Sequence, residues 1–147
     1  MNKQVTVAMN LENIADIGSK IRKHLIKRML VIISGPMGVG KTELIKNILP
    51  EYSVTSPSFL HANLYGNVES SKECANFAHI DAYTIKSKEA LFSLDIDELL
   101  KDRCVIVEWG ELFEKEFEIF DATILKIELI QNGKERFIFL NNSDILL

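Results

Sequence analysis

A run of eight residues in this 147-residue chain has the composition of a phosphate-binding loop. Residues 35–42 fit the pattern G-x-x-x-x-G-K-[ST], in which backbone N–H groups surround the phosphates. The lysine of this pattern, Lys41, places its charge at the β- and γ-phosphates, and the hydroxyl of Thr42 is a Mg²⁺ ligand. The motif favours binding of a nucleoside triphosphate over a chance glycine-rich turn. We expect the nucleotide to contact Gly35, Pro36, Met37, Gly38, Val39, Gly40, Lys41 and Thr42.

Two carboxylates follow apolar runs elsewhere in the chain. Residues 104–107 end in Glu108, and residues 77–80 end in Asp81. In an open α/β sheet, side chains at the carboxyl ends of strands face the ligand crevice. One acid could therefore hold Mg²⁺ while the other orients or activates the attacking water, although each could instead cap a turn. With Lys41, these two acids are the expected catalytic residues.

Two further residues lie close to these acids in the sequence. Trp109 follows Glu108 and is expected either in the core or at the mouth of the site, where it would shield the phosphates from water. His79 precedes Asp81 by two residues. We expect it to be a hydrogen-bonded strand histidine and rank it below Asp81 as a catalytic residue.

The segments that flank the loop are those that it requires. Residues 29–33 are apolar and predict a buried strand, and residues 43–49 have helical spacing up to Pro50. A strand, a glycine loop and a helix in this order aim several N–H groups at one point, beside the positive end of the helix dipole.

The remaining segments predict an α/β protein. The other expected strands are 4–7, 52–56, 59–65, 74–80 and 104–107. The other expected helices are 11–25, 87–94 and 95–101, capped by Asn10, Ser87 and Asp95. Residues 123–140 predict a hairpin around Asn132-Gly133. We expect a P-loop NTPase-like three-layer domain over residues 1–147, with a mixed, mostly parallel sheet and added β-hairpins.

Composition narrows the function further. A net charge of −4 argues against a large nucleic-acid footprint. Basic residues gather at 20–28 and acidic residues at 111–121, either as solvated faces or as docking surfaces for oppositely charged partners. The longest apolar run is far shorter than the ~20 residues that a membrane-spanning helix needs, and no signal peptide is expected. Cys74 and Cys104 are expected to be reduced. We expect a cytoplasmic protein.

Four motifs, taken in order, resemble the TsaE family (also called YjeE), the small ATPases of bacterial tRNA threonylcarbamoyladenosine synthesis. The family pattern is G-x-L-G-x-G-K-T, then S-P-T-[FY], H-x-D-x-Y-R and E-W-P. The corresponding segments are residues 35–42, Ser-Pro-Ser-Phe at 56–59, His-Ile-Asp-Ala-Tyr-Thr at 79–84 and Glu-Trp-Gly at 108–110. The first motif is generic, whereas the other three in this order are specific. The resemblance covers essentially the whole chain.

The resemblance implies roles for individual residues. Thr42 and Glu108 would hold Mg²⁺, Asp81 would serve hydrolysis, and Ser56 and Ser58 would belong to a loop that responds to the γ-phosphate of ATP. It also implies two partners, a threonylcarbamoyl transferase (TsaD-like) and its inactive homologue (TsaB-like). Hydrolysis of ATP would reset the complex of these two proteins. Contact with tRNA would be indirect or minor, and no membrane is involved.

The chain departs from the family at several positions. Pro36 replaces an acid, Ser58 a threonine, Thr84 an arginine and Gly110 a proline. Loss of the arginine matters most, since charge at a phosphoryl transition state can contribute ~10³ or more in rate. Lys86 or Lys88 could compensate, the arginine could be structural, or the enzyme could be slower alone.

Rival functions are a GTPase, a small-molecule kinase and a non-catalytic protein that docks in an ATP-dependent way. The D-x-x-G and N-K-x-D motifs of GTPases do not occur. Small kinases clamp phosphates with several lid arginines, and this chain has only Arg22, Arg28, Arg103 and Arg136.

Overall fold

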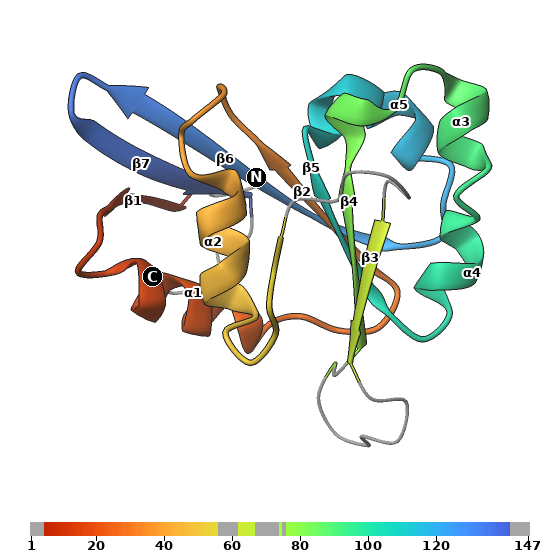
Figure 1. Cartoon of the computed structure of the whole chain (residues 1–147), viewed down its shortest axis with the longest axis horizontal. Coiled ribbons are helices and arrows are strands. Elements are labelled where there is room, and N and C mark those ends of the chain that lie inside the picture. The colour runs from red at the N-terminus through yellow and green to blue at the C-terminus, as the bar shows by residue number, and fades with distance from the viewer. Residues whose placement is uncertain (1–4, 56–61, 67–73, 75, 142–147) are drawn as a thin grey trace.

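The computed structural model describes residues 5–55, 62–66, 74 and 76–141, and contains one seven-stranded mixed sheet with helices on both sides (Figure 1). The strands lie in the order β1-β7-β6-β2-β5-β4-β3. The α/β fold class is confirmed. The elements in chain order are β1 (Val5–Met9), α1 (Ile14–Arg22), β2 (Met29–Ser34), α2 (Lys41–Ile48), β3 (Ala62–Gly66), β4 (Asn76–Asp81), η1 (Ala82–Thr84), α3 (Lys88–Phe92), α4 (Ile96–Leu100), β5 (Cys104–Glu108), η2 (Gly110–Phe113), α5 (Glu114–Phe117), β6 (Thr123–Asn132) and β7 (Glu135–Leu140).

The central strands of the sheet are parallel and the outer ones antiparallel. β2 pairs in parallel with both β5 and β6, and β5 pairs in parallel with β4. The antiparallel pairs are β1 with β7, β6 with β7, and β3 with β4. The carboxyl ends of β2, β4 and β5 therefore meet at one edge of the sheet, where a ligand crevice forms in open α/β folds.

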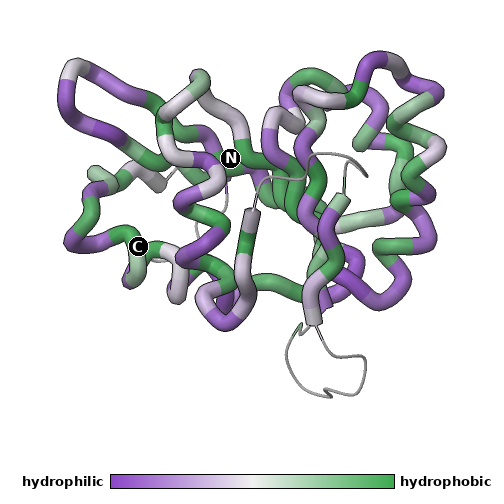
Figure 2. Tube along the Cα trace, in the orientation of Figure 1, coloured by the Kyte–Doolittle hydropathy of each residue, from purple (hydrophilic) through white to green (hydrophobic). Residues whose placement is uncertain are grey.

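The apolar residues form two cores, one on each face of the sheet. On β2, Val31 and Ile33 pack with α1 and α2, whereas Leu30 and Ile32 pack with α3, α4 and α5. Since successive strand residues point to opposite faces, a continuous apolar strand supplies both cores. Figure 2 shows this apolar centre as the green strands between more polar helices. No helix among the described residues is long and apolar enough to cross a bilayer.

The prediction of a helix over residues 11–25 is wrong at both ends, because α1 ends at Arg22. The helix begins at Ile14 after Asn13, while the Asn10 side chain instead accepts hydrogen bonds from the N–H groups of Glu12 and Asn13. Leu11, the first residue of the expected helix, is 89% exposed. Asparagine readily closes such a local turn, and this competes with its use as a helix cap.

The other elements follow the predictions with two exceptions. Asp95 precedes α4 with φ +57°, but its side chain makes no capping hydrogen bond. Ser87 caps α3 through its hydroxyl, and β6 and β7 form the predicted hairpin around Gly133. The strand expected at 52–56 is absent over residues 52–55, which form a turn and irregular chain, and residue 56 lies outside the described part.

Gly18 allows α1 to lie close against α2. A Cβ atom at this position would lie 2.3 Å from the carbonyl oxygen of Asn47. Helix propensity alone predicts that Gly18→Ala stabilises the protein by about 1 kcal/mol. We expect the opposite, a loss of about 1–3 kcal/mol in the free energy of unfolding, because the two helices must separate.

Urea denaturation checks this expectation, with Ser19→Ala on the exposed side of the same helix as the control. The control should change stability by less than about 0.5 kcal/mol. A stabilised Gly18→Ala protein would show that the helices are not in tight contact.

Candidate nucleotide-binding site

The phosphate loop connects β2 to α2, as the sequence predicts. Gly40 directly precedes α2 with φ +110°, a backbone conformation that favours glycine. Met37 is 72% exposed at the loop surface, whereas Val39 is fully buried in the core. Any contact of Val39 with a ligand would therefore be made by its backbone.

Lys41 is held by its own loop. Its ammonium group donates hydrogen bonds to the carbonyl oxygens of Gly35 at 2.6 Å and Pro36 at 2.9 Å, and lies 3.9 Å from the ring centroid of Trp109. Burial lowers the pKa of Lys41, although the carboxylates of Glu111, Glu108 and Asp81 act in the opposite direction. A phosphate would compete with two neutral carbonyls and an aromatic face for this cation.

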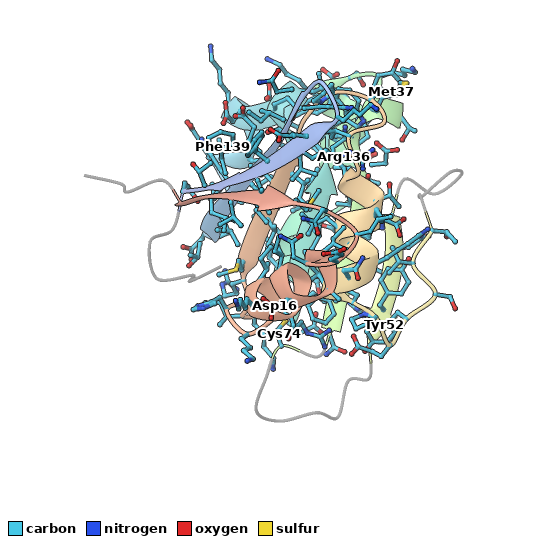
Figure 3. The ribbon with its side chains drawn as sticks, turned by 90° about the vertical axis from the view of Figure 1, so that its left-hand side faces the viewer. Asp16, Met37, Tyr52, Cys74, Arg136 and Phe139 are labelled. Carbon is cyan, nitrogen blue, oxygen red and sulfur yellow. The ribbon has the colours of Figure 1, made fainter. Side chains whose placement is uncertain are left out.

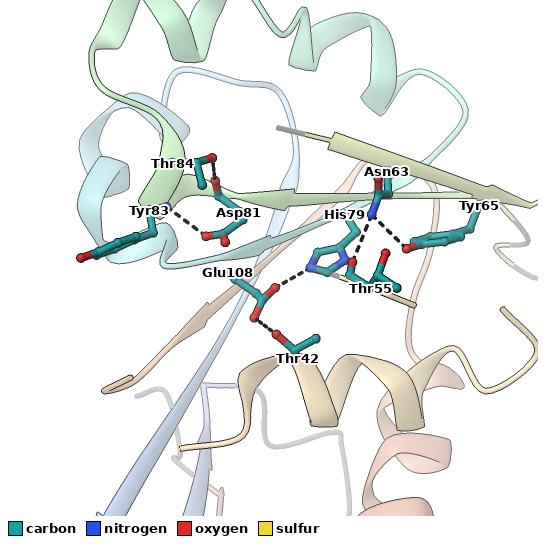
Figure 4. Close-up of polar contacts among 9 residues, drawn as sticks. All are labelled: Thr42, Thr55, Asn63, Tyr65, His79, Asp81, Tyr83, Thr84 and Glu108. Carbon is teal, nitrogen blue, oxygen red and sulfur yellow. Dashed lines mark hydrogen bonds and ion pairs between the residues drawn. The ribbon is translucent and has the colours of Figure 1, made fainter. Parts of the chain in front are cut away.

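Glu108 lies between Thr42 and His79 (Figure 4). The hydroxyl of Thr42 donates to Oε1 of Glu108 at 2.6 Å, and Nε2 of His79 lies 2.6 Å from Oε2. Burial raises the pKa of Glu108, but the hydrogen bonds with His79 and Thr42 and the charge of Lys41 outweigh it and hold this pKa below its ordinary value. Glu108 is therefore a carboxylate at neutral pH.

The register of two parallel strands explains this grouping. Asp81 at the end of β4 pairs with Glu108 at the end of β5, and His79 pairs with Ile106. Since side chains alternate between faces, His79 and Asp81 share the face of β4 that packs toward α2. His79 reaches Glu108 along the diagonal between neighbouring strands, a distance that side chains can span.

Asp81 both caps a turn and lines the candidate site. Its Oδ1 accepts a hydrogen bond from the N–H of Tyr83 at 3.1 Å and so caps η1, while its carbonyl oxygen accepts from the hydroxyl of Thr84. Asp81 also lines the same cavity as Glu108. The capping role therefore does not remove Asp81 from the site.

Trp109 turns the chain at the end of β5. Its backbone has φ +60°, which is rare for a bulky residue and often marks a functional site. The indole ring lies 5.1 Å from the ring of Tyr83, measured between centroids, and beneath the Lys41 ammonium. Trp109 therefore belongs to the wall of the site as well as to the edge of the core.

These side chains surround one open cavity of about 340 Å³. The residues that line it are Met37, Gly38, Gly40, Lys41, Thr42, Glu43, Asp81, Glu108 and Trp109. Gly35 and Pro36 line an adjoining hollow with Trp109. Ser56 and Ser58, also expected at the nucleotide, lie outside the described residues.

The hydrogen-bonded strand histidine expected at residue 79 is confirmed, but neither its partner Glu108 nor the contact between Tyr83 and Trp109 was predicted. A signal for His79 was present, because Phe77, His79 and Asp81 alternate along one strand and so share a face. The sequence does not show that β5 lies next to β4 in this register, which brings Glu108 within hydrogen-bonding distance of His79.

Comparison with known proteins decides the family. Residues 8–138 match the family described as "Threonylcarbamoyl adenosine biosynthesis protein TsaE". The chain belongs to the TsaE family. The resemblance drawn from the four motifs is thereby confirmed.

Individual TsaE relatives agree with this assignment. The "tRNA threonylcarbamoyladenosine biosynthesis protein TsaE" of Mycobacterium bovis is 33% identical over 111 residues, which cover 69% of this chain and 65% of that protein. The protein of the same name from Rickettsia felis is 27% identical over 142 residues, covering 86% of this chain and 79% of that protein. This chain thus spans just under two thirds of the length of the mycobacterial relative.

A solved structure supports the fold. Bacillus subtilis YdiB superposes with a TM-score of 0.65 and 21% sequence identity, covering 99% of this chain and 90% of that one. The likeness extends over the whole sheet with its helices.

Two departures from the TsaE motifs have a visible setting in the structure. A Cβ atom on Gly110, where the family has proline, would lie 2.4 Å from Cγ2 of Ile32. The glycine therefore accompanies an isoleucine that fills this space. Thr84, in place of arginine, bonds to Asp81, and Lys88 lies 3.5 Å from Glu116. Neither Lys86 nor Lys88 is among the residues that line the cavity.

Proposed function

We propose that this chain is a Mg²⁺-dependent ATP hydrolase that serves tRNA threonylcarbamoyladenosine biosynthesis. The observation that carries the proposal is the contact at 2.6 Å between the Thr42 hydroxyl and the Glu108 carboxylate, at the first turn of the helix that follows the phosphate loop. A hydroxyl and an acid in this place are the protein ligands of Mg²⁺ in P-loop nucleotide hydrolases.

The donor set fits Mg²⁺. Both groups are hard oxygen donors, and Mg²⁺ in nucleotide sites takes one or two carboxylates together with phosphate oxygens and waters. A dedicated cage is therefore not expected, and none is found, since no group of three or more His, Cys, Asp or Glu in the described part of the chain could hold a metal. Bound Mg²⁺ would neutralise charge that develops on the phosphates.

Lys41 would supply a second positive charge, beside that of Mg²⁺, at the phosphates. We infer that it exchanges the carbonyls of Gly35 and Pro36 for the β- and γ-phosphate oxygens. The exchange is favourable because a phosphate oxygen carries negative charge and attracts the ammonium more strongly than a neutral carbonyl oxygen does. Trp109, beneath the ammonium, keeps water from one side of it.

We propose that Asp81 orients the attacking water. It lines the cavity across the strand pair from Glu108, and the N–H of Tyr83 holds one of its oxygens. An acid that is fixed in this way, one strand away from the metal ligand, can accept a hydrogen bond from water without competing for the cation.

The nucleoside would extend to the other side of the loop. A second cavity of about 290 Å³ lies there, lined by residues of β1, α1 and the β6–β7 hairpin, with Glu43 shared between the two cavities. Nη1 of Arg136 lies 3.3 Å from a Cβ built on Gly40, which places this cation against the loop. Figure 3 shows Met37 and Arg136 at one end of the molecule and Cys74 at the other. The preference for ATP rests on the absence of guanine-reading motifs and on the family.

The pathway and partners come from the family. The matched relatives are named for tRNA threonylcarbamoyladenosine biosynthesis, and we propose that this chain binds the TsaD-like transferase and its TsaB-like homologue and resets them by hydrolysis. It would not transfer the carbamoyl group itself.

The site argues against a kinase. All four arginines lie in the described part of the chain, and none lines the cavity that contains Lys41. Arg22 binds the carbonyl of Ile48, and Arg103 binds those of Tyr65 and Phe77. A lid of arginines over the phosphates is therefore not available from the described residues.

Release of ADP tests the proposal. The chain is mixed with ATP and Mg²⁺, alone and with the transferase pair, and Lys41→Ala is the negative control. We expect slow turnover alone and faster turnover with the pair. No turnover in either mixture would instead support a docking protein, and a requirement for a small acceptor that becomes phosphorylated would support a kinase. A pull-down with the pair in ATP and in ADP tests the partners separately.

Fluorescence can follow the movement of Lys41. Trp109 is the only tryptophan in the chain, so its emission reports the neighbouring cation. We expect Lys41→Met to shift the emission of the unliganded protein, and ADP to shift that of the unsubstituted protein in the same direction. Lys126→Met, which removes a lysine paired with Glu114, should leave the emission unchanged. Identical spectra for Lys41→Met and the unsubstituted protein would contradict the contact.

A further inference from the structure

His79 is the most deeply buried polar residue beside the site. Its side chain is fully buried, and its Nε2 lies 2.6 Å from Oε2 of Glu108. Its other ring nitrogen, Nδ1, has no hydrogen-bond partner among the described residues. Among the described residues, Glu108 is therefore the hydrogen-bond partner of this imidazole.

The direction of the hydrogen bond follows from the chemistry of the partners. The carboxylate oxygens of Glu108 can only accept hydrogen bonds, so Nε2 of His79 is the donor in this 2.6 Å contact. The donated bond holds Oε2 of Glu108. The other oxygen, Oε1, faces the hydroxyl of Thr42 and the cavity.

Packing alone does not explain a histidine at this position. Phe77 and Ile106, the strand neighbours on the same face, belong to an apolar core that a hydrophobic side chain would extend. A buried polar nitrogen without a partner, such as Nδ1 of His79, lowers the stability of the fold. Without a donor at residue 79, however, Oε2 of Glu108 would be the unpaired group, and a buried carboxylate oxygen is more costly still.

We propose that His79 is a positioning residue that fixes the Glu108 carboxylate, so that Oε1 alone is presented to Mg²⁺ beside Thr42. The inference rests on the proposed function. Groups that orient a metal ligand restrict its rotation, and their removal typically lowers metal affinity 10–100-fold. His79 acts through Glu108 and does not itself contact the nucleotide or the metal.

A matched pair of variants separates positioning from packing. Gln and Met side chains have the same length. His79→Gln retains an N–H donor that can reach Oε2 of Glu108, whereas His79→Met fills the space without a donor. The readout is binding of Mn²⁺ in the presence of ADP, followed by electron paramagnetic resonance. This readout does not depend on turnover.

We expect His79→Met to weaken Mn²⁺ binding about 10–100-fold and His79→Gln to keep it within about threefold of the unsubstituted protein. Binding of ADP without metal should be the same in all three. Unchanged Mn²⁺ affinity in His79→Met, or equal losses in both variants, would overturn the inference. If His79→Met does not fold, His79→Asn replaces it, because the shorter amide cannot reach Glu108.

The two proposals fail in different ways. If the unsubstituted protein binds Mn²⁺ with ADP but does not hydrolyse ATP, the hydrolase function fails while the comparison of Gln with Met still decides the role of His79. If the unsubstituted protein hydrolyses ATP and His79→Met binds Mn²⁺ normally, only the positioning role fails.

Discussion

Replacing Glu108 by glutamine is expected to lower Mg²⁺-dependent ATP turnover by about 10²–10³-fold. The amide has the same shape and can still accept from the Thr42 hydroxyl, but it removes the negative charge that faces the cation. Several kcal/mol of transition-state stabilisation depend on a metal in such sites, and each ~1.4 kcal/mol is a factor of ten in rate. Turnover is measured at increasing Mg²⁺ concentrations.

A second glutamate provides the control. Glu111 lies close enough to Lys41 to affect its pKa, yet it does not line the cavity that Thr42 and Glu108 line. Glu111→Gln should change turnover by less than about threefold, since it removes a charge near Lys41 without removing a metal ligand. Normal hydrolysis by Glu108→Gln would contradict the metal-ligand role.

Replacing Asp81 by asparagine is expected to leave ATP binding nearly unchanged and to lower turnover by about 10²–10⁴-fold, the range of general acid–base catalysis. The choice of asparagine matters because Asp81 also caps η1. Its amide oxygen can still accept from the N–H of Tyr83, so the local fold is preserved while the charge is lost. Nucleotide affinity is measured by calorimetry and turnover by ADP release.

Asp81→Ala complements this experiment. It removes the cap as well as the carboxylate, so it should lose about 0.5–2 kcal/mol of stability that Asp81→Asn retains. Loss of nucleotide binding in Asp81→Asn would mean that Asp81 holds the ligand and is not a catalytic group.

The site is internally paired in this structure. Lys41 is bound to two carbonyls of its loop, Thr42 to Glu108, and Glu108 to His79. Under the proposed function, Mg²⁺ and nucleotide would replace the first two of these contacts, whereas the contact with His79 would persist. This difference is why His79 can orient the carboxylate both before and after the cation arrives.

Thr84 bears on the rate that such a site can reach. It bonds to the backbone of Asp81 and carries no charge, and Lys41 is the one cation among the residues that line the phosphate cavity. A partner that supplies a cation would raise turnover, as a partner's arginine does in other P-loop enzymes. Stimulation by the transferase pair would agree with this explanation.

The parts of the site that are contiguous in the chain could be predicted from sequence patterns. The phosphate loop, the strand before it and the helix after it follow from consecutive residues, because glycine φ angles, apolar alternation and helical spacing act over short range. The acids at the ends of β4 and β5 were recognised in the same way. Local signals were less decisive at Asn10, where a side-chain turn displaced the expected helix cap.

The contacts between these parts depend on the order and register of the strands in the folded sheet. Glu108 reaches Thr42 because β5 lies beside β2, and it reaches His79 because β4 lies on the other side of β5 in the register that pairs Asp81 with Glu108. Strand order and register are set by contacts between residues far apart in the chain, and a shift of one residue would turn each side chain to the opposite face. No pattern within a single segment carries that information.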